Sequence, residues 1–188
     1  MDRRVKYTQK IIKETLIDLL NEKQITKISV SEICEIADIN RATFYRYYVD
    51  VYDLLDKIED AFSLELIEAF KKAEITDYTV SKFVKSLLRV FLDNKKLVKV
   101  LFNHKTSTNF LENILELVYD TCKNKWEEEM PNVKDEDIEY ASIYLFNGAL
   151  GVINFWIKND FDKNIDEIAN IIEQLAYFGL KKYIYKNI

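Results

Sequence analysis

The sequence predicts an all-α protein with short connections between its helices. Only three glycines and one proline occur among 188 residues, whereas sheets and long loops need more turn-forming residues. Apolar residues also recur at intervals of three and four, which is the spacing of one helix face. Hydrophobic residues make up 48% of the chain, so one sizeable domain, or a small domain joined to a larger one, can bury a core.

Three short helices are predicted within the first fifty residues. The first covers residues 8–22, and its apolar stripe consists of Ile12, Leu16, Leu19 and Leu20. The second opens at the S-x-x-E capping box of Ser29 and Glu32, and its buried stripe consists of Val30, Ile33, Cys34 and Ala37. After a tight turn, Asn40 caps a third helix over residues 41–48. Two helices joined by a turn of about three residues are the outline of a helix-turn-helix unit.

A long helix is predicted to lead from this small unit into a larger helical bundle. Asp50 can cap it, and it covers residues 51–72 without a flexible linker before it. The helices expected after it span residues 79–93, 95–104, 107–129, 136–158 and 165–186. The predicted architecture is therefore an N-terminal three-helix helix-turn-helix domain at residues 1–50, joined by a long helix to a C-terminal helical bundle within residues 51–188.

The third short helix, NRATFYRYY at residues 40–48, combines four aromatic rings with two arginines. At about 100° per residue, Phe44 and Tyr48 share one face and are expected to pack inward. The other positions are Ala42, Thr43 and Arg46 on the opposite face, and Tyr45 and Tyr47 on the two flanks. One short helix cannot bury rings on every side while carrying arginine, so the outer face is predicted to be a recognition surface.

Such an outer face suits a helix lying in the major groove of double-stranded DNA. Ala42 and Thr43 can contact base edges or a thymine methyl group. Arg46 can donate to guanine or to a phosphate, and Arg41 can do either. The tyrosine hydroxyls and the Ser29 hydroxyl are expected to bind phosphates, which fixes register but reads no sequence.

The charge distribution agrees weakly with a DNA-binding N-terminus. Residues 1–50 hold nine Lys and Arg against eight Asp and Glu, whereas residues 51–188 hold eighteen against twenty-four. Three of the cations, Arg3, Arg4 and Lys6, precede the first predicted helix. They are expected to be disordered until they meet DNA, where they can follow the backbone or enter the minor groove.

The run SVSEICEIADINRATFYRYYVDVYDLLDKI resembles the helix-turn-helix of the TetR-type (TetR/AcrR) transcriptional regulators. A hydroxyl residue opens helix two, an ATFYRYY-like segment forms helix three, and a Leu-Leu pair follows at the start of helix four. The resemblance covers about residues 8–58. It implies that five residues occupy positions that usually touch DNA: Ser29, Arg41, Thr43, Tyr45 and Tyr47.

Three positions depart from the pattern of that family. Asp38 stands in the turn where the family usually has glycine, and it tolerates a left-handed backbone at some cost. Gln24 replaces a second usual glycine, before helix two. Val51 replaces a lysine that commonly grips phosphate, so DNA affinity and its salt dependence are expected to be reduced.

The resemblance also implies a homodimer formed by the C-terminal helices. The last two predicted helices carry more apolar surface than one chain needs for its own core. The residues expected in the dimer interface are Leu150, Ile153, Trp156, Ile157, Ile168, Ile172 and Leu175. Gly148 and Gly151 either admit a partner backbone or serve packing within the chain. A twofold dimer presents two recognition helices about 34–36 Å apart and therefore reads a near-palindromic operator.

A pocket for a small apolar effector is implied in the same way. The candidate residues are Phe83, Leu87, Phe91, Phe102, His104, Phe110, Tyr119, Trp126 and Tyr144. Residues of these types are more often ordinary core residues than ligand contacts. In this family an effector would favour one spacing between the helix-turn-helix domains of the two protomers. It would so change the fraction of dimers that can bind DNA. The predicted outcome is a ligand-responsive repressor, although nothing in the residues names the ligand.

Composition argues against an enzyme, a cofactor or a metal. A single histidine excludes multi-histidine metal sites, and three glycines leave no phosphate-cradling loop. The two cysteines lack CxxC spacing and are expected to be reduced and buried. No stretch of about 18 uninterrupted apolar residues is present, so no membrane partner and a cytoplasmic location are expected. A rival prediction is a helical dimer that binds protein as a co-regulator, with weak or lost DNA affinity.

Overall fold

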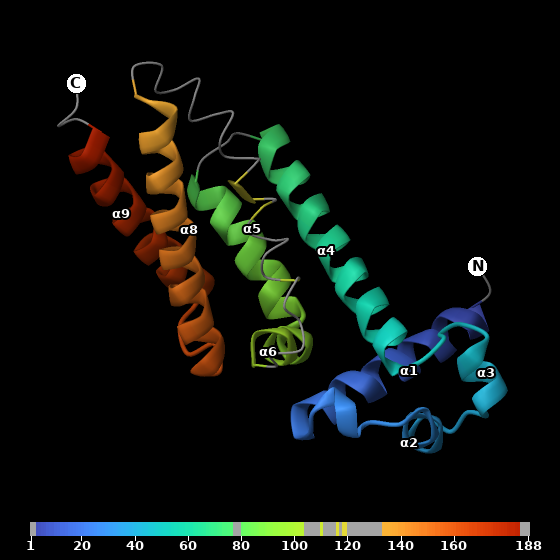
Figure 1. Cartoon of the computed structure of the whole chain (residues 1–188). Helices are drawn as coiled ribbons and strands as arrows, with labels where there is room; N and C mark the ends of the chain where they lie inside the picture. The colour runs from blue at the N-terminus through green and yellow to red at the C-terminus, as the bar shows by residue number, and fades with distance from the viewer. Residues whose placement is uncertain are drawn as a thin grey trace. The chain divides into compact units, whose positions relative to one another are not determined.

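A computed structural model describes residues 3–76, 80–103, 110, 116, 118–119 and 133–184. Its helices are α1 (Arg3–Glu22), α2 (Val30–Ile36), α3 (Arg41–Tyr45), α4 (Val51–Thr76), α5 (Val80–Asp93), α6 (Lys95–Asn103), α8 (Asp135–Lys158) and α9 (Ile165–Ile184), with a 3-10 turn at Ile25–Lys27 (Figure 1). The all-α prediction is confirmed. Most of the helix predicted at residues 107–129 lies outside the described residues.

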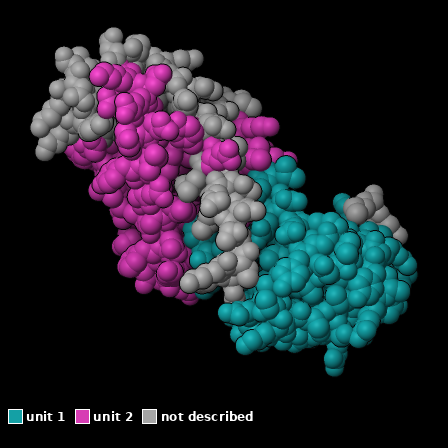
Figure 2. Space-filling view, viewed as in Figure 1, with its two compact units in different colours: residues 1–65, 94–107 teal, residues 66–93, 108–188 magenta. Residues whose placement is uncertain are grey.

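The chain forms two compact units, which Figure 2 shows in two colours. Unit 1 comprises residues 1–65 and 94–107, and unit 2 comprises residues 66–93 and 108–188. Helix α4 contributes its first part to unit 1 and its last part to unit 2. Unit 1 therefore contains α6 in addition to the small helices, whereas a functional division after residue 50 stays a prediction.

Unit 1 has its core along the inner face of α1. The predicted apolar stripe of this helix is buried, and α1 packs against α2 and α6. Two ion pairs connect these elements at the surface. Lys23, which follows α1, binds Glu32 of α2, and Lys96 of α6 binds Asp18 of α1 at 2.8 Å. The Lys96–Asp18 pair is exposed and pairs of that kind contribute little to stability, so burial of the apolar stripes is the main force holding unit 1 together.

The first helix begins earlier than predicted. Arg3, Arg4 and Lys6 were expected before the helix and without order, but they lie in its first turns. The Thr8 hydroxyl also donates to the Arg4 carbonyl oxygen at 3.0 Å, as it can only within a helix. The first repeating apolar residues predict a later start for this helix. Arginine and lysine are good helix formers, so the helix can extend to Arg3 without further apolar residues.

Unit 2 is built around α9, which contacts both α5 and α8. Helix α5 buries Phe83, Leu87 and Phe91 along one side. The Phe83 ring stacks on Phe70 of α4 with centroids 4.3 Å apart. At the surface, Lys85 of α5 pairs with Asp166 of α9 at 2.7 Å. Apart from this ion pair, the contacts described are made by the buried apolar side chains. Core packing therefore mainly determines where the helices of unit 2 lie.

Trp156 holds the turn between α8 and α9. Its side chain is 1% exposed, and its indole nitrogen donates to the Lys163 carbonyl oxygen at 2.8 Å. The indole ring also meets the Phe161 ring edge to face, with centroids 4.9 Å apart. After the turn, Asn164 and Glu167 bind each other's backbone N–H and so cap α9. This turn is therefore fixed by a buried ring as well as by backbone bonds.

Most of the predicted dimer residues belong to this core instead. Five of the seven are buried within the single chain: Ile153, Trp156, Ile157, Ile168 and Ile172. Leu150 is half-buried and Leu175 is exposed. Apolar periodicity marks a buried stripe but does not say which molecule covers it, and here α5 and α9 cover much of it. The five buried residues are therefore corrected to intrachain core positions.

Candidate nucleic-acid interface

The helix-turn-helix predicted from the sequence is present in unit 1. The Ser29 hydroxyl accepts a hydrogen bond from the Glu32 amide at 3.2 Å and caps α2. The Asn40 carboxamide accepts one from the Thr43 amide at 2.7 Å and caps α3. Between the helices, Asp38 has a φ of 51°, which is the left-handed backbone that the tight turn needs. The predicted caps and turn are confirmed.

The two departures at glycine positions have different costs. Gln24 has φ −67° and ψ 147°, an extended backbone that any residue adopts, so no glycine is needed there. Asp38 does occupy the left-handed region. Among non-glycine residues, aspartate and asparagine enter this region at the lowest cost. The turn therefore tolerates the missing glycine through the choice of aspartate.

We expect Asp38→Ala to lower the free energy of unfolding by about 1 kcal/mol, because alanine lacks the local hydrogen bonding that eases a left-handed backbone. Asp38→Gly should be within about 0.5 kcal/mol of the natural protein, since glycine adopts this φ freely but loses more chain entropy. Urea unfolding of the three proteins measures the difference. Equal stability of the alanine and glycine variants would contradict a strained turn.

The side chains of α3 divide between core and surface as predicted. Phe44 is fully buried and Tyr48 is 3% exposed, and their ring centroids lie 5.5 Å apart. The exposed positions are Arg41, Ala42, Tyr45 and Arg46, while Thr43 and Tyr47 are half-buried. The helix itself is shorter than the predicted 41–48, because Arg46 is its C-cap and Tyr47 belongs to the turn that follows. The predicted recognition surface thus covers one helical turn and its C-terminal cap.

Hydrogen bonds already orient part of this surface. The Thr43 hydroxyl donates to the Asn40 carboxamide oxygen at 2.9 Å, so its oxygen as acceptor and its methyl group are left for contacts outside the chain. The Arg41 guanidinium donates to the Ser31 hydroxyl on α2. The Ser29 hydroxyl uses its oxygen as the helix cap, which leaves its proton for another acceptor. Arg41 is therefore tied to the scaffold.

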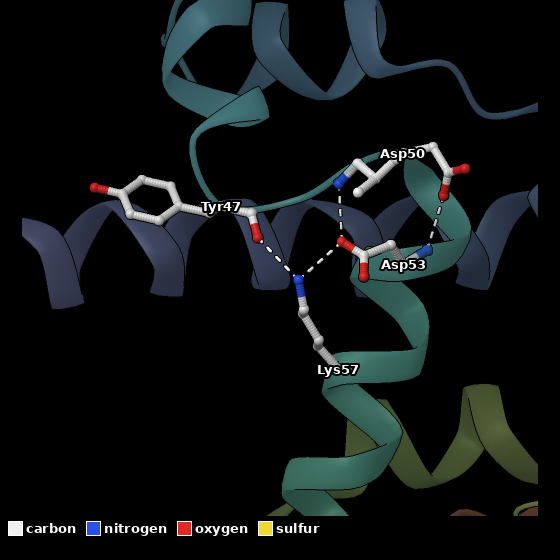
Figure 3. Close-up of polar contacts among 5 residues, drawn as sticks. Tyr47, Asp50, Asp53 and Lys57 are labelled. Carbon is white, nitrogen blue, oxygen red and sulfur yellow. Dashed lines mark hydrogen bonds and ion pairs between the residues drawn. The ribbon is translucent and has the colours of Figure 1, made fainter.

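The turn between α3 and α4 carries a polar cluster that the sequence did not predict, which we call the α4 clamp: Val49, Asp50, Asp53 and Lys57 (Figure 3). The Lys57 ammonium donates to the Tyr47 carbonyl oxygen at 3.0 Å and to the Asp53 carboxylate at 2.9 Å. The same carboxylate accepts from the Val49 amide at 2.8 Å. The hydrogen bond from Lys57, and then that from Val49, holds the pKa of Asp53 below its usual range. Asp53 is therefore charged at neutral pH.

Two further residues near this turn and helix α2 are core positions. Val51, which replaces the family's usual phosphate-binding lysine, is 5% exposed and packs with the apolar stripe of α4. Cys34 is buried in α2, and burial raises the pKa of its thiol. The predicted burial of Cys34 is confirmed, whereas Cys122 lies outside the described residues.

The predicted effector residues that the structure describes differ in their burial. Phe83, Leu87, Phe91 and Phe110 are buried, whereas Phe102 and Tyr119 are half-buried and Tyr144 is 74% exposed. Tyr119 contacts the Phe146 ring edge to face, with centroids 6.4 Å apart. His104 and Trp126 lie outside the described residues. The effector pocket stays a prediction.

An apolar face of α8 and α9 is exposed among the residues that the structure describes. A hollow of about 490 Å³ opens between the two helices. Its lining residues are Ile143, Tyr144, Leu145, Asn147, Gly148, Ala149, Val152, Ile172, Leu175 and Ala176. A Cβ added at Gly148 or Gly151 would meet no described atom within 4 Å, so packing within the described chain does not require these glycines. Helix α8 is also long and apolar enough to cross a membrane, judged by length and composition alone.

The geometry defines a helix-turn-helix protein with an all-helical body. A family profile described as "Transcriptional regulator C-terminal region" matches residues 78–177. The dhaKLM operon transcriptional activator DhaS of Lactococcus lactis subsp. lactis is 30% identical over 149 residues, or 76% of this chain and 74% of DhaS. The chain belongs to the TetR family of transcriptional regulators.

Solved structures share the fold. A TetR-like regulator from Rhodococcus sp. RHA1 matches with a TM-score of 0.72 and 18% identity, over 96% of this chain and 98% of that one. The fatty acid degradation regulator FadR from Bacillus halodurans matches with a TM-score of 0.70 and 15% identity, over 93% and 96%. At such identities the likeness concerns the fold alone. Within the described residues, no group of three His, Cys, Asp or Glu side chains could hold a metal ion.

Proposed function

We propose that this protein is a cytoplasmic transcriptional regulator that binds a near-palindromic DNA operator as a homodimer and responds to a small apolar effector. The observation that carries the proposal is the outward face of α3, where Ala42 and Arg46 are exposed while Phe44 is buried. A helix with this division can enter the major groove without uncovering its own core. The proteins it resembles are named as transcriptional regulators rather than enzymes.

The contacts within unit 1 suggest a role for each residue of the surface. The Thr43 methyl group and Ala42 fit a thymine methyl group or close approach to a base edge. Arg46 is the cation that can reach guanine, since Arg41 is held by Ser31. Tyr45, Tyr47 and the Ser29 hydroxyl would bind phosphates, and Arg3, Arg4 and Lys6 would approach the backbone from the first turns of α1.

The homodimer is supported by the uncovered apolar face of α8 and α9. Its exposed side chains are Tyr140, Ile143, Tyr144, Phe155, Leu175, Tyr177 and Phe178. Three of them, Ile143, Tyr144 and Leu175, line the hollow between the two helices, and large exposed apolar patches typically mark an interface. Gly148 and Gly151 lie open beside them, so a partner helix can approach the backbone closely. A second copy of the chain would also explain why α8 is unusually apolar.

Titration of the protein against duplexes from its own upstream DNA, at several salt concentrations, tests DNA binding. We expect one palindrome to be bound, with log affinity falling in proportion to log salt by about 0.9 per neutralised phosphate. Binding that is absent at low salt and appears only with a protein partner would instead support the co-regulator alternative. The buried Val51 and the net charge of −5 favour that alternative, and the outward α3 surface opposes it.

The protein can either repress or activate transcription of the genes that it regulates. The resemblance to the TetR-type regulators implies a repressor. The similar protein DhaS is named as an activator, which favours activation as the second candidate. A reporter gene placed behind the bound palindrome decides between them, because its output falls with a repressor and rises with an activator.

A further inference from the structure

Helix α3 is so short that its orientation within unit 1 must be fixed by contacts with neighbouring residues. It comprises five residues, Arg41–Tyr45, and isolated helices of that length are not stable in water. Its N-terminus is capped by Asn40, and Phe44 anchors its middle in the core. Its C-terminal end leads into a turn whose backbone groups cannot all be satisfied within α3. The direction of the recognition surface therefore depends on what holds that turn.

The α4 clamp holds both sides of the turn. Lys57 donates to the Tyr47 carbonyl oxygen before Tyr48, and Asp53 accepts from the Val49 amide after it. Lys57 and Asp53 also bind each other, so the two backbone groups are joined through one ion pair (Figure 3). Asp50 accepts from the Asp53 amide at 2.8 Å and caps α4 at the same place. The Tyr47 carbonyl oxygen lies just past the C-cap of α3, so the lysine fixes the turn directly after the helix.

The clamp leaves the Tyr47 side chain outside. In Figure 3 the Tyr47 ring extends away from the polar cluster, while its carbonyl oxygen faces Lys57. The Lys57 ammonium lies 5.4 Å from the centre of the Tyr48 ring, which is buried next to Phe44. One lysine thus contacts the backbone of an outward tyrosine and the ring of an inward one.

We propose that Asp53 and Lys57 are positioning residues that fix the direction in which α3 presents its surface to DNA. This inference rests on the proposed function. Lys57 is not assigned a phosphate contact, because two of its three donors are occupied and Asp53 neutralises its charge. It therefore does not replace the lysine that Val51 displaced. Its effect on DNA binding passes through the backbone of Tyr47.

Lys57→Met tests the proposal, because methionine keeps the apolar stem and removes the ammonium. Lys10→Met is the matched control: it removes the same charge from an exposed pair on α1, where Lys10 lies 3.7 Å from Glu14. Lys57→Arg is the rescue variant, since a guanidinium can still donate to both oxygens. The probes are the palindromic duplex found by titration and a random duplex of equal length, each at four salt concentrations. Hydrogen exchange of the Val49 amide in the free protein reports on the clamp itself.

For Lys57→Met we expect faster Val49 exchange and about tenfold weaker binding to the palindrome, the factor that a hydrogen bond to a charged group typically supplies. Binding to the random duplex and the salt slope should match those of Lys10→Met. Lys57→Arg should restore both exchange and affinity.

Three results would overturn the positioning role. A salt slope flatter by about one, with equal loss on both duplexes, would make Lys57 a phosphate contact. Unchanged Val49 exchange would show that the clamp does not hold the turn. Faster exchange with unchanged affinity for the palindrome would show that the turn does not direct α3. Failure of the natural protein to bind any duplex is a separate result, which refutes the proposed function and the positioning role with it.

Discussion

Trp156→Glu should unfold unit 2 rather than yield a folded monomer. Truncation of a buried tryptophan costs about 3–5 kcal/mol, and an unpaired buried carboxylate adds several more. The change also removes the hydrogen bond to the Lys163 carbonyl oxygen and the edge contact with Phe161. For a chain of this size, each kcal/mol lowers the melting temperature by about 2–4 °C. We therefore expect a loss of about 10–30 °C in calorimetry, or no soluble protein.

Leu175→Glu is the matched variant on the uncovered face. Leu175 is 63% exposed and lines the hollow between α8 and α9, so the single chain loses little when it becomes charged. If a second copy covers this face, sedimentation should show a monomer that keeps its helical circular dichroism. A Trp156→Glu protein that is folded and monomeric would show that Trp156 is a dimer-interface residue and not a residue of the intrachain core. A dimer that persists in Leu175→Glu would place the interface elsewhere.

The sequence predicted the small helices well because their signals are local. Ser29 and Asn40 are caps whose partners lie three residues away, and Asp38 sits where the turn needs a left-handed backbone. Phe44 and Tyr48 follow from helical spacing alone. Such features depend only on neighbours along the chain, so residue type and spacing are sufficient to find them.

Features that depend on distant groups were missed or misplaced. In the sequence, Asp53 and Lys57 have only the i, i+4 spacing of a helix-surface pair, and only the turn geometry brings the Tyr47 carbonyl oxygen to the lysine. Trp156 read as an interface residue because helix α8 is apolar on more than one side. The spacing of the apolar residues does not tell which side of α8 packs against its own chain and which side is left for a partner. Tyr144 and Leu175, on the exposed side, show which of these positions a partner can reach.

Arg46→Ala should weaken operator binding and relax the preference at one base position in each half-site by about 1–3 kcal/mol, if its guanidinium binds guanine. Arg46 is exposed at the C-cap of α3, and its backbone amide, not its side chain, donates to the Ala42 carbonyl oxygen. Removal of the side chain should therefore leave stability unchanged within about 0.5 kcal/mol. Binding to duplexes with each operator base pair replaced in turn, at one salt concentration, measures the preference.

Arg41→Ala is the control that separates base-specific contacts from the electrostatic attraction of a cation to the DNA phosphates. It removes the same charge from the other end of α3, where the exposed Arg41 guanidinium already donates to the Ser31 hydroxyl. We expect it to weaken binding to every duplex by a similar factor and to leave the base preference unchanged. Equal behaviour of the two variants on the duplex panel would remove Arg46 from base reading and leave both arginines as phosphate contacts. Specificity would then have to come from Ala42, Thr43 and the shape of the DNA, since no other exposed cation lies on α3.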